Sequence, residues 1–167
     1  MLPAAGVLLH FSENPDIVEF QPHVAATARQ SEAYVWTVDA LNAPCYWFPR
    51  QCPRVCHWEA TGRRVHAIER AWLGTLAATT LHAYPFAAAD FEPFGERPHA
   101  FVSTRQVQPL GPPTAVTDLP GLHAAHGIEL LVLGRLEEHF ATVREAGHDF
   151  SAIRMRNGGL GPGAFAS

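Results

Sequence analysis

The sequence predicts a mixed α+β fold, in which a single domain holds a mostly antiparallel sheet and a few short helices. The chain has 167 residues, the size of one ordinary domain. Its composition, 47% hydrophobic and 17% charged residues, is that of a globular protein and not of a disordered one. Short runs rich in β-branched and aromatic residues recur along the chain, and such runs are typical of strands.

Two apolar runs predict strands in the N-terminal part of the chain. Residues 6–11 form a short apolar run that ends before a turn at Asn14-Pro15, and His10 lies at the end of this strand. Residues 34–39 combine aromatic and β-branched side chains, and they give the clearest strand in the sequence.

Residues 45–55 contain three aromatic residues, two arginines, two prolines and two cysteines. Each proline fixes its own φ angle and biases the preceding residue toward an extended conformation, so we expect a stiff, extended loop that carries Arg50 and Arg54. Planar guanidinium groups beside aromatic rings suit a flat or anionic ligand, and Tyr46 and Trp47 could stack on a base. The alternative is a structural corner, in which the aromatic rings are buried and the arginines pair with carboxylates.

The rest of the chain alternates between predicted strands and short helices. Strands are predicted at residues 64–69, 79–84, 100–103, 128–133 and 150–157, and helices at residues 71–76, 119–126 and 136–146. We expect Pro85 to end the strand before it and Gly147 to end the last helix. The globular domain should extend over residues 1–157, and the glycine-rich residues 158–167 should form a disordered tail.

Charge and composition exclude several classes of function. The net charge is −4 and no run of basic residues is present, so we expect no nucleic-acid partner. All twelve positive side chains are arginines, which excludes a lysine nucleophile or a Schiff base. No apolar run approaches the roughly 20 residues of a membrane span, and no signal peptide is recognisable. Three clustered cysteines fit a reducing compartment, so a cytoplasmic protein is expected.

The cysteines and histidines do not predict a metal site. Cys45, Cys52, Cys56 and His57 lack the paired spacing of a zinc site. Six further histidines show no ligand spacing on a common element: His82, His99, His123, His126, His139 and His148. A separate hypothesis makes Cys52 a nucleophile, because two nearby arginines could lower the pKa of its thiol and a histidine could act as its base.

Several motifs occur in a characteristic order along the chain. They are His10-Phe11-Ser12, Val35-Trp36, Trp47-Phe48-Pro49-Arg50, Cys52-Pro53-Arg54-Val55, Val65-His66-Ala67-Ile68-Glu69, Phe150-Ser151 and Ile153-Arg154-Met155-Arg156-Asn157. In this order they resemble a small bacterial family that carries only a label of unknown function. The resemblance covers nearly the whole chain, and the Pro-Arg-x-Cys-Pro-Arg motif at residues 49–54 is its specific part. It implies a family without implying an activity.

A more distant similarity is to ADP-ribosyltransferase-like folds. Several such families open with a strand that ends in His, followed by Phe or Thr and a hydroxyl residue, as His10-Phe11-Ser12 does. In those folds the histidine and the hydroxyl group hold the ribose of NAD, and a late-strand glutamate steers the oxocarbenium chemistry. The resemblance implies these ribose-binding roles for His10 and Ser12. We assign the role of the glutamate to Glu69, which ends an apolar strand, with Glu129 as the second candidate.

The leading hypothesis is a small cytoplasmic enzyme that acts on a nucleotide-like or phosphorylated small molecule. Its specific form is cleavage of the N-glycosidic bond of NAD, by ADP-ribosyl transfer or by NAD hydrolysis. Arg50 and Arg54 would neutralise the phosphates, and Arg154 and Arg156 would join this anion site if the C-terminal segment is extended. NAD is a substrate in this hypothesis, and no cofactor or metal is expected.

Two alternatives stay open. Thr104-Arg105 stand where the resembled pattern has a glutamate, which favours a tailoring enzyme of small-molecule (natural product) biosynthesis that does not use NAD. The second alternative is a non-catalytic ligand-binding or partner module. In that case His10 is satisfied by backbone groups and Glu69 pairs with an arginine.

Overall fold

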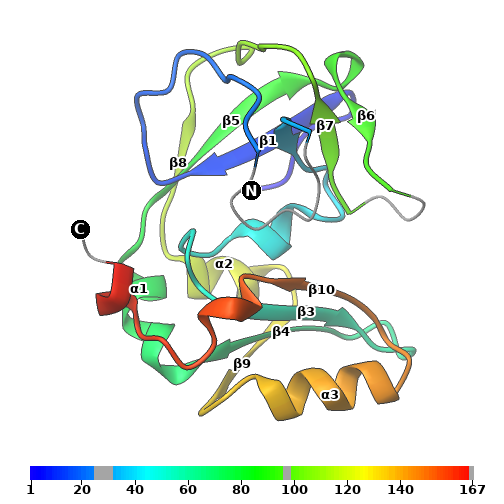
Figure 1. The fold of residues 1–167 in the computed structure, drawn as a ribbon, viewed down its shortest axis with the longest axis vertical. Helices are drawn as coiled ribbons and strands as arrows, with labels where there is room; N and C mark the ends of the chain where they lie inside the picture. The colour runs from blue at the N-terminus through cyan, green and yellow to red at the C-terminus, as the bar shows by residue number, and fades with distance from the viewer. Residues whose placement is uncertain (25–31, 96–98, 166–167) are drawn as a thin grey trace. The chain divides into compact units, whose positions relative to one another are not determined.

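The structure is a computed structural model that describes residues 1–24, 32–95 and 99–165. It has a mixed α+β fold with mostly antiparallel strands and few short helices, as the sequence predicts (Figure 1). Within these described ranges, the strands form three sheets instead of one. The chain divides into two compact units, Met1–Trp47 with Leu81–Val116 and Phe48–Thr80 with Thr117–Ser167. The single domain that the sequence predicts at residues 1–157 stays a prediction.

The first unit contains two three-stranded antiparallel sheets. One sheet has the order β1 (Val7–Ser12), β5 (Leu81–Ala87), β8 (Thr114–Val116), and the other has the order β2 (Val35–Thr37), β7 (Phe101–Ser103), β6 (Glu92–Pro93). Two 3₁₀ helices, η1 (Ala43–Tyr46) and η3 (Ala88–Asp90), complete the unit. Its largest apolar cluster among the described residues comprises Leu8, Phe20, Val35, Tyr84, Phe86 and Phe91.

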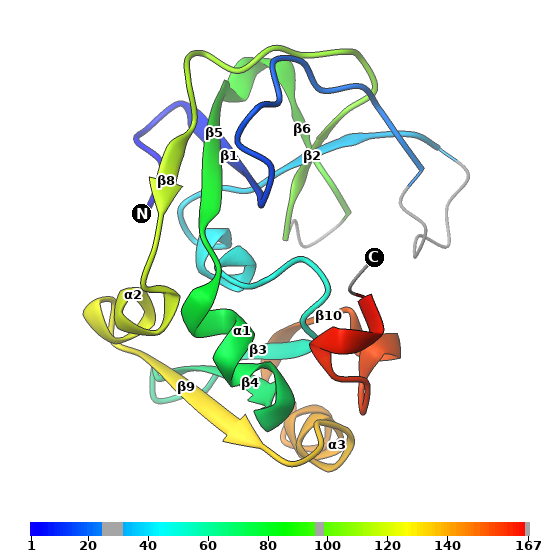
Figure 2. The ribbon, with the colours of Figure 1, turned by 90° about the vertical axis from the view of Figure 1, so that its left-hand side faces the viewer.

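The second unit is a four-stranded sheet with helices on both faces. Its strand order is β10 (Asp149–Ile153), β3 (Arg54–Trp58), β4 (Arg64–Glu69), β9 (Ile128–Leu133), and only the β4–β9 pair of these is parallel. Helix α3 (Glu137–Glu145) covers one face, and α1 (Leu73–Ala78) and α2 (Leu119–Ala125) cover the other (Figures 1 and 2). The 3₁₀ helices are η2 (Arg70–Trp72), η4 (Met155–Asn157) and η5 (Pro162–Phe165).

Strand β3 presents different chemistry on its two faces, because successive side chains of a strand point to opposite sides. Val55 packs with Val143 and Leu136 on the α3 side of the sheet, so His57, two residues later, faces the same side. The alternate residues, Arg54 among them, face the side of α1 and α2. The loop predicted at residues 45–55 includes the start of this strand, and for residues 54–55 the prediction is wrong. Pro49 and Pro53 favour a loop, and they lie directly before the short run that forms the strand.

Strand β5 extends farther than the sequence predicts. Pro85 was expected to end it, and this prediction is wrong, since the strand continues to Ala87. The partner of Pro85 in β1 is Leu9, and Leu9 makes its two backbone hydrogen bonds with Val38 instead of with β5. The ladder therefore needs no N–H group from residue 85, and a proline is tolerated there.

The glycine-rich C-terminal segment makes defined contacts within the second unit. The N–H group of Gly159 donates to Glu69, and the carbonyl of Leu160 accepts a hydrogen bond from Trp72 Nε1. Residues 166–167 lie outside the described residues. The expected disorder of the tail from residue 158 stays a prediction.

Candidate functional site: an arginine cluster in the second unit

His10 and Ser12 lie on the same face of β1, as their spacing of two residues requires. His10 Nδ1 lies 2.8 Å from the carbonyl oxygen of Trp36, so this nitrogen carries the hydrogen of the bond. The imidazole ring also packs edge-on against the ring of Phe20, with 4.8 Å between the ring centres. Ser12 Oγ accepts a hydrogen bond from the N–H group of Asn14 in the following turn. A role for either residue in ribose binding stays a prediction.

The two aromatic residues assigned to base stacking differ in exposure. Tyr46 ends η1 and packs, partly buried, against the apolar cluster of Val38, Ala43 and Ala100. Trp47 is fully buried, with 0% of its surface exposed. A ring without exposed surface cannot stack on a ligand unless the chain around it moves, so the structural interpretation is favoured for Trp47.

Glu69 ends β4 with 2% of its surface exposed, and backbone groups occupy both oxygens of its carboxylate. Oε1 accepts from the N–H group of Leu136 at 3.3 Å, and Oε2 accepts from the N–H group of Gly159 at 2.7 Å. The guanidinium group of Arg135 lies 3.9 Å from Oε1. These contacts bind the start of α3 and the C-terminal segment to the end of β4. They supply a structural role for Glu69, and its catalytic role stays a prediction.

Arg54 is a buried cation at the start of β3, with 3% of its surface exposed. Its Nη1 donates to the carbonyl of Cys52 at 3.0 Å, and its guanidinium carbon lies 5.1 Å from the centre of the Phe48 ring. Such an arrangement fixes the guanidinium plane and keeps the cation in a medium of low polarity.

The C-terminal segment joins the loop at residues 49–53 through two hydrogen bonds. Ile153 pairs with Arg54 at the end of the β10–β3 ladder, so the residues that follow β10 lie beside the loop. Arg154 Nε donates to the carbonyl of Arg50 at 3.2 Å, and Asn157 Nδ2 donates to the carbonyl of Gln51 at 2.7 Å. The strand predicted at residues 150–157 is too long, since β10 ends at Ile153 and residues 155–157 form the 3₁₀ helix η4. Arg154 and Arg156 therefore lie beside the loop without the extended conformation that the sequence predicts.

Arg50, Arg54, Arg154 and Arg156 form the feature that we call the arginine cluster. Burial lowers the pKa of the Arg154 guanidinium, and the positive charges of the other three arginines lower it further. Arg154 has a φ angle of 57°, in the left-handed region that side-chain-bearing residues avoid. Arg50 and Arg156 are exposed, whereas Arg154 is half-buried. The cluster therefore concentrates positive charge where two chain segments meet.

Cys52 is not suited to nucleophilic catalysis in this environment. Burial raises the pKa of its thiol to about 12, because the neutral form is favoured away from water. Arg54 acts in the opposite direction and Glu69 reinforces the effect of burial. The thiol stays protonated at neutral pH, which argues against the hypothesis of a cysteine nucleophile.

A chain of hydrogen bonds runs through two buried histidines, His66 and His123, whose contact with each other the sequence did not predict. Arg64 Nε donates to His66 Nε2 at 3.0 Å, so His66 carries its hydrogen on Nδ1. That nitrogen lies 3.1 Å from His123 Nε2, and His123 Nδ1 lies 2.7 Å from the carbonyl of Leu119. Burial lowers the pKa of His123 to about 4 and the pKa of His66 well below its ordinary value. Both imidazoles are therefore neutral. His66 donates to His123, and His123 donates to the carbonyl of Leu119.

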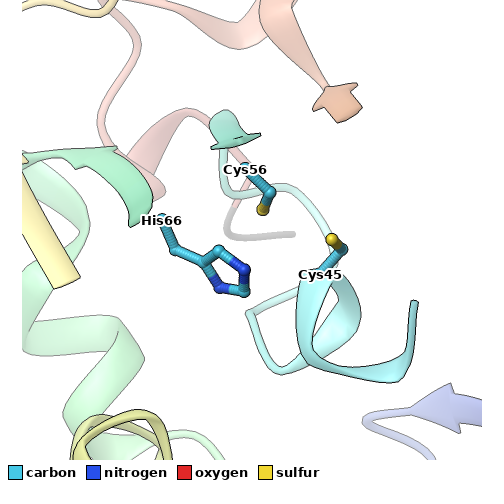
Figure 3. Close-up of side chains that lie close together, drawn as sticks. All are labelled: Cys45, Cys56 and His66. Carbon is cyan, nitrogen blue, oxygen red and sulfur yellow. The ribbon is translucent and has the colours of Figure 1, made fainter. Parts of the chain in front are cut away.

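Figure 3 shows His66 together with Cys56, its register partner on β3. Directly paired residues of antiparallel strands point to the same face, so both side chains face the α1 and α2 side of the sheet. Cys45, which the figure also labels, belongs to η1 of the first unit.

Residues 9–158 match the profile described as "Family of unknown function (DUF6886)". The chain belongs to this family. The resemblance to an uncharacterised family is thereby confirmed, and the matched span of DUF6886 includes every residue of the arginine cluster. No curated protein and no solved structure matches the chain. Among its described residues, this DUF6886 protein has no helix with the length and apolar character needed to cross a bilayer.

Proposed function

We propose that this DUF6886 protein binds a phosphorylated, nucleotide-like small molecule through the arginine cluster. The observation that carries the proposal is the convergence of arginines from two segments, held by the bond from Arg154 to the Arg50 carbonyl. Like charges repel, so the cluster gains most from a ligand that carries two or more negative charges. Phosphate and pyrophosphate groups supply such charge, and their oxygens match the planar guanidinium fork.

The backbone at Arg154 supports a binding role. A left-handed conformation costs a residue other than glycine roughly 1–2 kcal/mol, and such strain persists where surrounding contacts impose it. Here the contacts are those of Arg154 with Arg50 and of Asn157 with Gln51. Strained residues occur often at ligand sites, because the fold holds a side chain where the ligand needs it.

Cleavage of the N-glycosidic bond of NAD is the specific enzymatic form of the proposal. Its support is the resemblance of His10-Phe11-Ser12 to ADP-ribosyltransferase-like folds, with His10 and Ser12 on one face of β1. The backbone donors that engage both oxygens of the Glu69 carboxylate weigh against the assigned catalytic role. The main proposal is therefore that the arginine cluster binds phosphate groups. Cleavage of NAD in the cytoplasm extends this proposal. The alternative enzymatic role is a step of small-molecule biosynthesis that does not use NAD.

A thermal-shift experiment with NAD, ADP and inorganic pyrophosphate tests the proposal. We expect all three to raise the melting temperature of the wild-type protein, because each carries a pyrophosphate group. Release of nicotinamide from NAD, measured by mass spectrometry on wild type and His10→Ala, tests the enzymatic extension separately. Binding without release would retain the main proposal and exclude NAD cleavage, whereas no shift with any of the three compounds would exclude both.

A further inference from the structure

Three histidines from three elements of the second unit lie together on the α3 face of the sheet. His57 belongs to β3, His139 to α3, and His148 to the turn between α3 and β10. The centre of the His57 ring lies 5.3 Å from that of His139 and 5.5 Å from that of His148. We call these residues the histidine cluster. It lies on the opposite face of β3 from Arg54, so it is independent of the arginine cluster.

The end of α3 explains how His148 reaches His57. Gly147 has a φ angle of 67°, and its N–H group donates to the carbonyl of Arg144. The N–H group of His148 then donates to the carbonyl of Val143, which completes a Schellman-type helix end and reverses the chain. Strand β10 follows and pairs with β3, placing Phe150 opposite His57.

Two ring nitrogens of the histidine cluster are buried without a hydrogen-bond partner among the described residues. They are His57 Nδ1 and His139 Nε2, and His57 as a whole is only 3% exposed. A buried polar atom without a partner is destabilising, and proteins rarely retain one unless a ligand, an ion or a water satisfies it. The carboxylate of Glu59, which acts on His57 electrostatically, forms an ion pair with Arg63.

We propose that the histidine cluster binds a divalent transition-metal ion such as Zn²⁺, with His57 Nδ1 and His139 Nε2 as two ligands and His148 as the third. Imidazole is a common ligand of Zn²⁺, and metal binding requires its neutral form. The fourth position of a tetrahedral ion remains for water.

His148 must rotate to complete the site. Its ring lies nearly parallel to that of His57, at an angle of 14°, and two parallel offset rings do not direct their nitrogens at one ion. His148 is half-buried and lies in a turn, so rotation about its side-chain bonds meets less packing than rotation of His57 would. Metal binding would therefore break the stacking of the His57 and His148 rings, and both rings would then coordinate the ion.

Calorimetric titration of the full-length protein with Zn²⁺ tests the site. We expect one equivalent to bind, and His139→Ala and His148→Ala each to weaken binding by about tenfold or more, as loss of a ligand does. His57→Asn is the third variant, with circular dichroism to check its fold. His126→Ala, which removes an exposed histidine of the same unit, is the matched control and should bind as the wild type does.

Cys56→Ser separates this site from thiolate ligation, because Cys56 is a buried cysteine of the same sheet. The proposal requires this variant to keep its Zn²⁺ affinity, and Co²⁺ bound to the wild type to lack the near-ultraviolet charge-transfer band of a thiolate ligand. Absence of Zn²⁺ binding would overturn the proposal. Binding that is lost in Cys56→Ser but kept in His139→Ala and His148→Ala would overturn it as well.

Discussion

At the residue scale, the contacts of Glu69 support one of the two roles that its position in the sequence allows. A glutamate at the end of an apolar strand could stabilise positive charge on a substrate or hold neighbouring backbone. The structure gives both carboxylate oxygens a backbone donor, from Leu136 and from Gly159. The catalytic hypothesis and the structural one now differ in a measurable quantity, the free energy of unfolding.

Glu69→Ala should lower the free energy of unfolding by on the order of 2 kcal/mol, because it leaves the buried N–H group of Leu136 without its acceptor and removes the bond to Gly159. Urea denaturation followed by circular dichroism measures this change. Glu137→Ala is the matched control, since Glu137 is exposed and also contacts Arg135, and we expect little change from it. An unfolding curve for Glu69→Ala that coincides with the wild-type curve would refute the structural role.

The two histidines joined in the buried hydrogen-bond chain predict a loss of stability in acid. Their ordinary pKa is 6.5, and the folded protein lowers the pKa of His123 to about 4 and that of His66 also below 6.5. The unfolded chain therefore binds more protons than the folded one below pH 6.5. Stability is fully present above this pH and falls as the pH decreases toward 4, by up to about 1.4 kcal/mol per pH unit for each imidazole.

His123→Gln removes one of these titrations and should reduce the pH dependence. We would measure urea denaturation of both proteins at pH 6.5 and at pH 4. The wild type should lose more stability than the variant between these two conditions, although the variant is the less stable protein at pH 6.5. An equal loss in both proteins would show that His123 does not contribute.

At the scale of elements, the two ends of α3 depend on different interactions. Its start is held by Glu69 through the N–H group of Leu136, and its end by the left-handed glycine Gly147. The sequence predicts the helix and its glycine end, because apolar residues recur at a helical spacing before Gly147. It does not predict the bond to Glu69, which joins residues 67 positions apart.

Gly147→Ala should destabilise the protein by about 1 kcal/mol, since a Cβ atom disfavours the left-handed conformation. Gly134→Ala is the control, because Gly134 has an ordinary φ angle and an added Cβ atom there would meet nothing within 4 Å. Thermal denaturation of the two variants provides the comparison. Equal melting temperatures would mean that the end of α3 rearranges without cost.

At the scale of the whole molecule, continuous apolar runs were predictable and contacts between distant segments were not. Strands β4 and β9 have the predicted bounds, because each is a short segment rich in aliphatic residues. Strand β3 was missed because prolines precede it. The predicted strand at residues 79–84 ends too early, because the sequence does not show that Leu9, the partner of Pro85, bonds to Val38. These bonds allow a proline within β5.

The two clusters show the same limit for function. Arg50 and Arg54 were selected as an anion site from local composition, and the register of β10 with β3 adds Arg154 and Arg156 to them. The histidines were set aside because no single element carries ligand spacing. In the structure, β3, α3 and the turn before β10 each contribute one histidine, so spacing along the sequence carries no signal for them.

The most direct test of the central claim is calorimetric titration of inorganic pyrophosphate into the wild type and into Arg50→Gln/Arg156→Gln. Both arginines are exposed, so their loss should leave the fold intact. Arg70→Gln, an exposed arginine of the same unit outside the cluster, is the control. We predict saturable binding to the wild type and the control, and an affinity lower by about tenfold or more in the double variant. Equal affinity in all three proteins would contradict an anion site at the arginine cluster.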